Sequence, residues 1–226
     1  MNTGRRFFWP SQFVQLRSAG SLCAWQKTVT ILVGAGVGLA VGCSGKSSIN
    51  PASAARMAVE MHDTNGDEIL SAEELKSCPG IGCELARYDT NSDGQLTAEE
   101  IAGRIDTFLD GSARFMSFSC TVTLNGRPLQ GALVELVPED FLGTAVEPAQ
   151  GTTTANGSVE LSVSQDALPP ANQPLKLVRP GIYQVRVTHP RVEIPPRYHA
   201  TTELGCEVSG EASNPAFPLR FELTSR

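Results

Sequence analysis

The sequence lacks most of the features that mark enzymes and nucleic-acid-binding proteins. It has three histidines in 226 residues, and its 24 acidic residues outnumber the 18 basic ones, for a net charge of −6. This balance argues against nucleic acid as a partner, because nucleic-acid binding needs an excess of positive charge. No HExxH helix, phosphate-binding glycine loop or nucleophile motif occurs. Both tryptophans lie before residue 30, so an aromatic sugar-binding platform is not expected. We therefore expect a protein that is not an enzyme.

No apolar run reaches the roughly 20 residues that a membrane-spanning helix needs. Residues 28–41 are apolar and uncharged, and they follow a segment that carries four basic residues and no acidic one. A basic segment followed by an apolar run of this length is typical of a signal peptide. The run leads through Leu-Ala-Val-Gly directly to Cys43. Small residues before a cysteine resemble the lipobox of bacterial lipoproteins.

This resemblance implies a cellular address and an anchor. Residues 1–42 would be a lipoprotein signal peptide, Cys43 would carry the lipid, and residues 43–50 would form a polar tether. Ser44, rather than an acidic residue, follows the cysteine, which in such lipoproteins implies transit to the outer membrane. The partner at this end is then the membrane, reached through the N-terminal lipid. The alternative is an uncleaved N-terminal anchor with an unmodified Cys43.

Export to an oxidising compartment would allow the remaining cysteines to form disulfides. Cys23 lies in the expected signal peptide, which leaves four cysteines in the mature chain after the lipidated one. An even number in an oxidising compartment predicts two disulfides, with three possible pairings. Local pairing within each half of the chain favours Cys78–Cys83, which flank a Pro-Gly turn, and Cys120–Cys206. The alternative is that some of these thiols stay free.

Acidic residues are concentrated in residues 51–110, where they number 13 against 4 basic ones. Most belong to a template that repeats after 26 residues, in residues 63–74 (the first loop) and residues 89–100 (the second loop). Ca²⁺ takes six to eight oxygen ligands, which such loops supply from positions 1, 3, 5, 7, 9 and 12, with a backbone carbonyl at position 7. At these positions the first loop carries Asp63, Asn65, Asp67, Ile69, Ser71 and Glu74. The second loop carries Asp89, Asn91, Asp93, Gln95, Thr97 and Glu100.

The repeat resembles a pair of EF-hands, which implies one or two bound calcium ions and a small α-helical domain over residues 51–111. Leu70 and Leu96, at position 8, are expected to pair across a short two-stranded contact. Both loops end in a capping box, which predicts that a helix starts there. The second loop is expected to bind more strongly, because position 6 needs a positive φ and is Gly94 there but Glu68 in the first loop.

Two questions about the repeat stay open. The chain between the loops is short and is interrupted by Pro79, so only short helices are expected there. One alternative is a pair of acidic turns that bind nothing. Bound calcium would have either a structural role or a regulatory one, in which the protein responds to changes in calcium concentration. Location in the cell envelope favours the structural role, because extracellular calcium sites are saturated at roughly millimolar concentrations.

From about residue 114 onward, apolar and polar residues alternate with a period of two. Apolar residues alternate with polar ones in several short runs, around residues 118–124, 159–163, 183–187 and 217–223, separated by Gly, Pro and Asn turns. Such runs are typical of strands with one buried face, and Asn125-Gly126 is a hairpin signal. We predict an antiparallel β-sandwich over residues 114–226. The fold class is then mixed, with a helical EF-hand pair followed by an all-β sandwich.

Three turn regions of this half stand out, around Asn125 to Val134, Gly151 to Gly157 and Gly181 to Val185. They resemble the turns of carboxypeptidase regulatory-like (transthyretin-like) domains. The resemblance implies a prealbumin-type sandwich without catalytic machinery, of the kind that accompanies enzymes, receptors and surface proteins as a folding or interaction module. The alternative is an unrelated sandwich of similar size.

The last candidate site is the Pro-rich stretch around His189, Glu193 and His199. Two histidines and a glutamate can bind a transition metal, but a Pro-interrupted stretch sets no fixed ligand spacing, so we expect an exposed loop. With Arg191, Arg197 and Tyr198 this loop is the expected contact surface of the sandwich.

These features predict a calcium-binding, lipid-anchored envelope protein with a non-catalytic structural or interaction role and an unknown envelope protein as its partner. The first alternative is a calcium-regulated accessory subunit of a secreted hydrolase or transport complex. The second is a metal-dependent hydrolase that uses the two histidines and the glutamate of the Pro-rich stretch.

Overall fold

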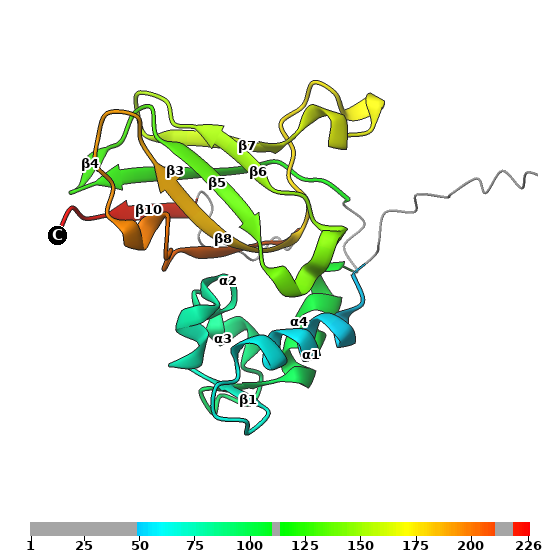
Figure 1. Ribbon diagram of the computed structural model, residues 1–226. Helices are drawn as coiled ribbons and strands as arrows, with labels where there is room; N and C mark the ends of the chain where they lie inside the picture. The colour runs from blue at the N-terminus through cyan, green and yellow to red at the C-terminus, as the bar shows by residue number, and fades with distance from the viewer. Residues whose placement is uncertain (1–48, 110–113, 211–218) are drawn as a thin grey trace, which may run out of the picture. The chain divides into compact units, whose positions relative to one another are not determined.

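A computed structural model describes residues 49–109, 114–210 and 219–226, and these residues belong to one compact unit (Figure 1). The expected signal peptide and Cys43 lie outside the described residues. No helix in the described part of the chain is long and apolar enough to cross a membrane. We call residues 49–109 the helical segment and the described residues from 114 onward the β-rich segment.

The helical segment consists of two longer helices joined by short elements. Its first helix begins with a side-chain cap, since the Asn50 side chain accepts a hydrogen bond from the backbone N–H of Ser53 at 2.9 Å and proline follows. The last helix buries Ile101, Ile105 and Phe108 and contacts the first. The elements are α1 (Pro51–His62), β1 (Ile69–Ser71), η1 (Glu74–Ser77), α2 (Pro79–Gly82), α3 (Leu85–Tyr88), β2 (Gln95–Thr97) and α4 (Ala98–Leu109). The prediction of short helices between the loops is confirmed.

The β-rich segment forms one eight-stranded sheet in the order β10-β3-β7-β6-β5-β8-β9, with β4 paired to β3. The strands are β3 (Phe118–Leu124), β4 (Arg127–Pro128), β5 (Leu133–Pro138), β6 (Ala149–Thr152), β7 (Ser158–Val163), β8 (Gly181–Thr188), β9 (Gly205–Val208) and β10 (Leu219–Leu223). The 3₁₀ helices are η2 (Asp140–Ala145), η3 (Gln165–Ala167), η4 (Pro170–Asn172) and η5 (Pro196–Tyr198). The prediction of a β-rich, sandwich-like fold is confirmed.

One pair of strands departs from the predicted antiparallel arrangement. β10 runs parallel to β3, with Phe221 opposite Val122, whereas the other paired strands of the sheet are antiparallel. β10 is not joined to β3 by a hairpin; it follows β9, which lies at the other end of the strand order. A strand that arrives by a crossover is free to add in the parallel direction.

The period-two pattern correctly identified the core-facing residues. Cys120, Val122 and Leu161 are fully buried, as are Val185 and Val187 of β8. The predicted hairpin also forms: the two residues between β3 and β4 have positive φ values of 51° and 75°, as a two-residue turn of this type requires.

The helical segment packs on the β-rich segment over β8 and β9. α2 contacts both strands, and α1 contacts η2. All four residues of β9 are buried, because one face lies in the core of the sheet and the helices cover the other. The buried residues of both segments form one continuous cluster. The two predicted domains thus share a core.

Candidate functional site

The first loop folds around its own side-chain oxygens. Asp63 accepts hydrogen bonds from the backbone N–H groups of Asn65, Gly66 and Glu68, at 3.1, 2.6 and 2.9 Å. The side-chain oxygen of Asn65 accepts from the backbone N–H of Asp67 at 2.8 Å. The Asp67 carboxylate accepts from the backbone N–H of Ile69 at 3.1 Å. The oxygens at positions 1, 3 and 5 are therefore held by backbone donors inside one turn.

The second loop repeats this network. Asp89 accepts from the backbone N–H groups of Asp93 and Gly94 at 3.2 and 2.8 Å. Asn91 accepts from the N–H of Asp93 at 2.8 Å, and Asp93 accepts from the N–H of Gln95 at 2.9 Å. The hydrogen bonds from position 6 to position 1, from position 5 to position 3 and from position 7 to position 5 are thus common to both loops.

The glutamate at position 12 closes each loop. In the first loop Glu74 accepts from the backbone and hydroxyl of Thr64, at 2.9 and 3.0 Å, and from the backbone and hydroxyl of Ser71, at 2.9 and 2.7 Å. Glu100 makes the equivalent four contacts to Thr90 and Thr97. Position 12 is thereby joined to positions 2 and 9. The predicted capping box is confirmed at the second loop, which leads into α4, whereas the first loop leads only into the short 3₁₀ helix η1, which starts at Glu74 itself.

These contacts favour the ionised form of both glutamates. Hydrogen bonds, led by that from the backbone N–H of Ser71, lower the pKa of Glu74 to about 2. Burial opposes ionisation at Glu100, but the hydrogen bonds from Thr97 and Thr90 outweigh it and lower the pKa of that carboxyl group. Each loop carries three carboxylates, at positions 1, 5 and 12, a donor set that suits a hard divalent cation, but in the described residues their oxygens do not all lie within 4.8 Å of one another.

The two loops contact each other through β1 and β2. These strands pair antiparallel, with Leu70 opposite Leu96, and both leucine side chains are fully buried. The predicted pairing at position 8 is confirmed. A change at one loop can therefore reach the other through a shared two-stranded contact.

The backbone does not support the argument that ranked the second loop above the first. Both loops have positive φ at two positions, 4 and 6. The first loop has Gly66 (79°) and Glu68 (65°), and the second has Ser92 (62°) and Gly94 (79°). Each loop thus has one non-glycine residue in the left-handed region, Glu68 in the first and Ser92 in the second. The conformational cost of that residue is therefore similar in both loops. The stronger second site stays a prediction, without support from strain.

No family model matches this chain, and no curated protein or solved structure matches it. The resemblances to lipoproteins, EF-hands and transthyretin-like domains therefore remain proposals that rest on this chain's own residues.

The four cysteines of the described residues are free thiols in the structure, so neither Cys78–Cys83 nor Cys120–Cys206 is formed in it. The first two have different surroundings. Cys78 is fully buried, and Cys83 is exposed, with its sulfur 3.6 Å from the carbonyl oxygen of Gly80.

The Pro-rich stretch is used for internal contacts. His189 Nδ1 accepts from the backbone N–H groups of Arg191 and Val192, at 3.0 and 2.9 Å, so that Nε2 is left to donate to Gln130 at 2.9 Å. His199 Nε2 lies 3.0 Å from the carbonyl oxygen of Ile194. In the described residues the two histidines and Glu193 do not form a cluster of metal-ligating atoms.

The expected contact surface on this stretch needs a correction. Tyr198 is buried, with its hydroxyl 3.3 Å from that of Thr224. The Arg197 guanidinium donates to the carbonyl oxygen of Thr224 at 2.9 Å and stacks on the Tyr198 ring at 4.8 Å. These two side chains hold the C-terminal residues and are not a free binding surface; Arg191 is exposed.

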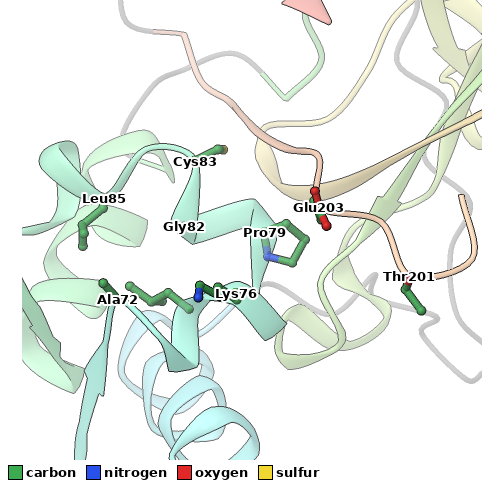
Figure 2. A pocket seen from close by; sticks show the side chains of 9 residues that line it. Ala72, Lys76, Pro79, Gly82, Cys83, Leu85, Thr201 and Glu203 are labelled. Atoms are coloured by element: carbon green, nitrogen blue, oxygen red, sulfur yellow. The ribbon is translucent and has the colours of Figure 1, made fainter. Parts of the chain in front are cut away.

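A cleft of about 750 Å³ lies beside α2, between η1 and the chain after η5 (Figure 2). Its lining is mainly aliphatic, with Lys76, Cys83 and Glu203 as its ionisable side chains among the described residues. The cleft was not visible in the sequence, because it is formed by residues more than a hundred positions apart.

Sequence reasoning also missed two buried carboxylates that join the segments. Glu207 on β9 is 2 % exposed and pairs with Arg104 of α4, and Glu139 after β5 is 2 % exposed and accepts from the backbone N–H of Gly80 at 3.0 Å. The sequence signal that could have indicated a buried carboxylate was a single acidic residue inside an apolar stretch, as Glu207 in Gly-Cys-Glu-Val.

Proposed function

We propose that this protein is a calcium-binding, lipid-anchored envelope protein in which two EF-hand-type loops order a non-catalytic structural or interaction module. The observation that carries the proposal is the repeated oxygen network. In both loops backbone N–H groups hold the oxygens of positions 1, 3 and 5, and the position-12 glutamate is joined to position 2; the loops are coupled through Leu70 and Leu96.

The charge of the loops supports a cation as the ligand. In the first loop Asp63, Asp67 and Glu74 repel one another, and in the second loop the equivalent three carboxylates do the same. Hard oxygen donors of this kind suit Ca²⁺, which accepts six to eight oxygens at flexible geometry. Binding would remove the repulsion and stabilise the fold, because the ion binds only where the folded chain brings the oxygens together.

A structural role follows from what is attached to the loops. The second loop runs directly into α4, whose third residue is Glu100 and whose Arg104 contacts β9. Calcium at this loop would fix the start of a helix that is joined to the sheet by an ion pair. This connection supports a structural role, in which bound calcium helps to hold the helical segment on the β-rich segment.

The anchor is the second part of the proposal. Cys43 would carry the lipid seven residues before Asn50, the cap of α1, and a tether of this length keeps the module close to the membrane surface. Cys43→Ala should move the protein from the membrane fraction to the soluble fraction, whereas Cys23→Ala, within the expected signal peptide, should leave it in the membrane fraction. Equal membrane retention of both variants would contradict lipidation at Cys43.

A calorimetric titration tests the calcium part. Residues 44–226 are titrated with Ca²⁺, alongside Glu74→Gln and Glu100→Gln and their neighbours Glu73→Gln and Glu99→Gln, which are exposed and outside the ligand set. Each position-12 variant should lose a binding event, and its neighbour should keep it. No binding up to about 10 mM Ca²⁺, well above the range of extracellular sites, would overturn the proposal.

A further inference from the structure

Three chemically different side chains meet where the helical segment contacts the sheet. His62 is the last residue of α1, Cys78 directly precedes α2, and Glu139 directly follows β5. One nitrogen, one sulfur and one carboxylate oxygen from these residues all lie within 4.8 Å of one another. Cys78 and Glu139 are 0 and 2 % exposed, and His62 is partly buried. None of the three is a ligand position of the calcium loops.

The histidine is held with one ring nitrogen available. His62 Nδ1 lies 2.8 Å from the hydroxyl oxygen of Ser77, and that hydroxyl donates to the carbonyl oxygen of Glu74 at 2.7 Å. Because the Ser77 hydrogen is used on the carbonyl, its oxygen accepts from Nδ1–H. The lone pair of the neutral ring is then on Nε2. Histidines that bind metals donate their other ring N–H in this way, which fixes the tautomer and the ring orientation.

The glutamate is also held from outside the cluster. The backbone N–H of Gly80 donates to Glu139 Oε1 at 3.0 Å, and the Gln184 side chain donates to Oε2 at 3.0 Å. Each carboxylate oxygen has two lone pairs, and one of those that remain accepts from the Cys78 thiol. Gly80 has no room for a side chain, since a Cβ would lie 2.8 Å from Glu139 Oε1. The carboxylate is therefore fixed in position before any ligand arrives.

Without a cation, burial favours the neutral forms of the two acidic members of the cluster. Burial raises the pKa of the Cys78 thiol and of the Glu139 carboxyl group. A divalent cation would neutralise one thiolate and one carboxylate, and it would leave no net charge in the buried site.

We propose that His62, Cys78 and Glu139 form a Zn²⁺ site that joins the helical segment to the sheet. A thiolate with an imidazole and a carboxylate is a donor set for Zn²⁺ and not for Ca²⁺ or Mg²⁺, which require oxygen ligands. As the sulfur–zinc bond forms, the thiol proton of Cys78 passes to solvent. Water completes the four-coordinate shell at the partly exposed side, next to His62.

The proposed site shares no ligand with the calcium loops, although His62 directly precedes Asp63 and its partner Ser77 donates to Glu74. Its ligands come from three elements that are separate in the sequence, and its softest ligand, Cys78, has no place in an oxygen-ligated loop. It does compete with the predicted Cys78–Cys83 disulfide, because a sulfur bound to zinc as a thiolate is not in a disulfide. The two cysteines of this turn therefore provide a matched pair of variants.

The test uses metal titrations of residues 44–226 under reducing conditions with calcium in excess, so that the loops are filled. Co²⁺ is added as a spectroscopic probe for Zn²⁺, and Zn²⁺ is then added to displace it. The wild-type protein and Cys83→Ser should bind one Co²⁺ with a thiolate charge-transfer band, and Zn²⁺ should abolish that band. Cys78→Ser and His62→Gln should show no band. Ser77→Ala, which removes the partner of His62 Nδ1, should weaken Zn²⁺ binding by about ten- to a hundredfold.

Four results would overturn the proposal. They are the absence of the band in the wild-type protein, its persistence in Cys78→Ser, its loss in Cys83→Ser, and a Cys78–Cys83 disulfide in protein isolated with zinc and without reductant. If Cys78→Ser does not fold, as judged by circular dichroism without metal, His62→Gln decides, because that side chain is partly exposed at a helix end.

Discussion

Arg104 on α4 and Glu207 on β9 form a two-point ion pair that is shielded from solvent. The guanidinium Nε lies 2.9 Å from Oε2, and Nη2 contacts Oε1, with side-chain exposures of 10 and 0 %. Arg87 adds a third contact to the same carboxylate at 3.4 Å. Two residues 103 positions apart thus fasten the helical segment to the edge strand of the sheet.

Arg104→Met should destabilise the protein by about 3 kcal/mol, because it leaves the buried Glu207 carboxylate short of a partner. Replacing both members, Arg104→Met with Glu207→Leu, should recover most of this loss, since an apolar pair of similar size needs no counter-charge. Urea unfolding measures both. The control is Lys76→Met, which breaks the exposed pair with Glu73 (side chains 71 and 79 % exposed) and should cost less than about 1 kcal/mol. A loss for Arg104→Met as small as the control would contradict this role.

Gly205 on β9 is packed directly against the backbone of α2. A Cβ at this position would lie 2.0 Å from the carbonyl oxygen of Pro79 and 2.5 Å from the nitrogen of Gly80. Gly205→Ala should therefore destabilise the protein by about 1–3 kcal/mol or more, because backbone atoms on both sides must separate.

Gly103 provides the matched substitution. It is exposed within α4, and no neighbouring atom lies within 4 Å of the point that a Cβ would occupy. Gly103→Ala should therefore stabilise the protein by about 0.5–1 kcal/mol through helix propensity. Thermal unfolding of the two variants should shift in opposite directions. Shifts of the same sign would show that the contact between α2 and β9 is not as tight as the structure has it.

Calcium removal should lower the thermal stability of the whole chain, because both segments share one core. At a free Ca²⁺ concentration a hundredfold above the dissociation constant, one site contributes about 2.7 kcal/mol. For a chain of this size that corresponds to a rise in Tm of roughly 5–10 °C. Calorimetry with and without a calcium chelator measures the shift, and Mg²⁺ at the same ionic strength is the control. Equal Tm values in calcium and chelator would contradict a structural role.

The local elements could be predicted because their signals lie within a few residues. The cap at Asn50, the capping box at Thr97 and the turn at Asn125 are each set by short-range chemistry. The core-facing residues of the strands follow from alternation in the same way. The ligand positions of the loops were also visible, because an oxygen template with fixed spacing repeats.

The contacts between segments could not be predicted, because they depend on which surfaces meet. The sequence offered Cys78 as half of a local disulfide, and only the packing of α2 on β8 and β9 brings it to His62 and Glu139. The parallel addition of β10 to β3 is of the same kind, since strand order at a sheet edge is not encoded in the alternation of Phe221 and its neighbours.

The sequence and the structure disagree on which calcium loop has the more strained backbone. Position 6 alone predicted that the first loop is the weaker one, but Ser92 at position 4 of the second loop has φ of 62°, close to the 65° of Glu68. Left-handed backbone costs a non-glycine residue about 1–2 kcal/mol. Glu68→Gly and Ser92→Gly should therefore each strengthen calcium binding at their own loop by about tenfold, less the entropy that glycine loses on ordering. Glu68→Ala, which removes the same charge but keeps a Cβ, and Ser92→Ala should give no such gain. Calorimetric titration of the four variants separates backbone strain from charge. Tighter calcium binding in Glu68→Gly but not in Ser92→Gly would restore the ranking by position 6. Equal gains in affinity would show that both loops carry the same backbone strain, at position 6 in the first and at position 4 in the second.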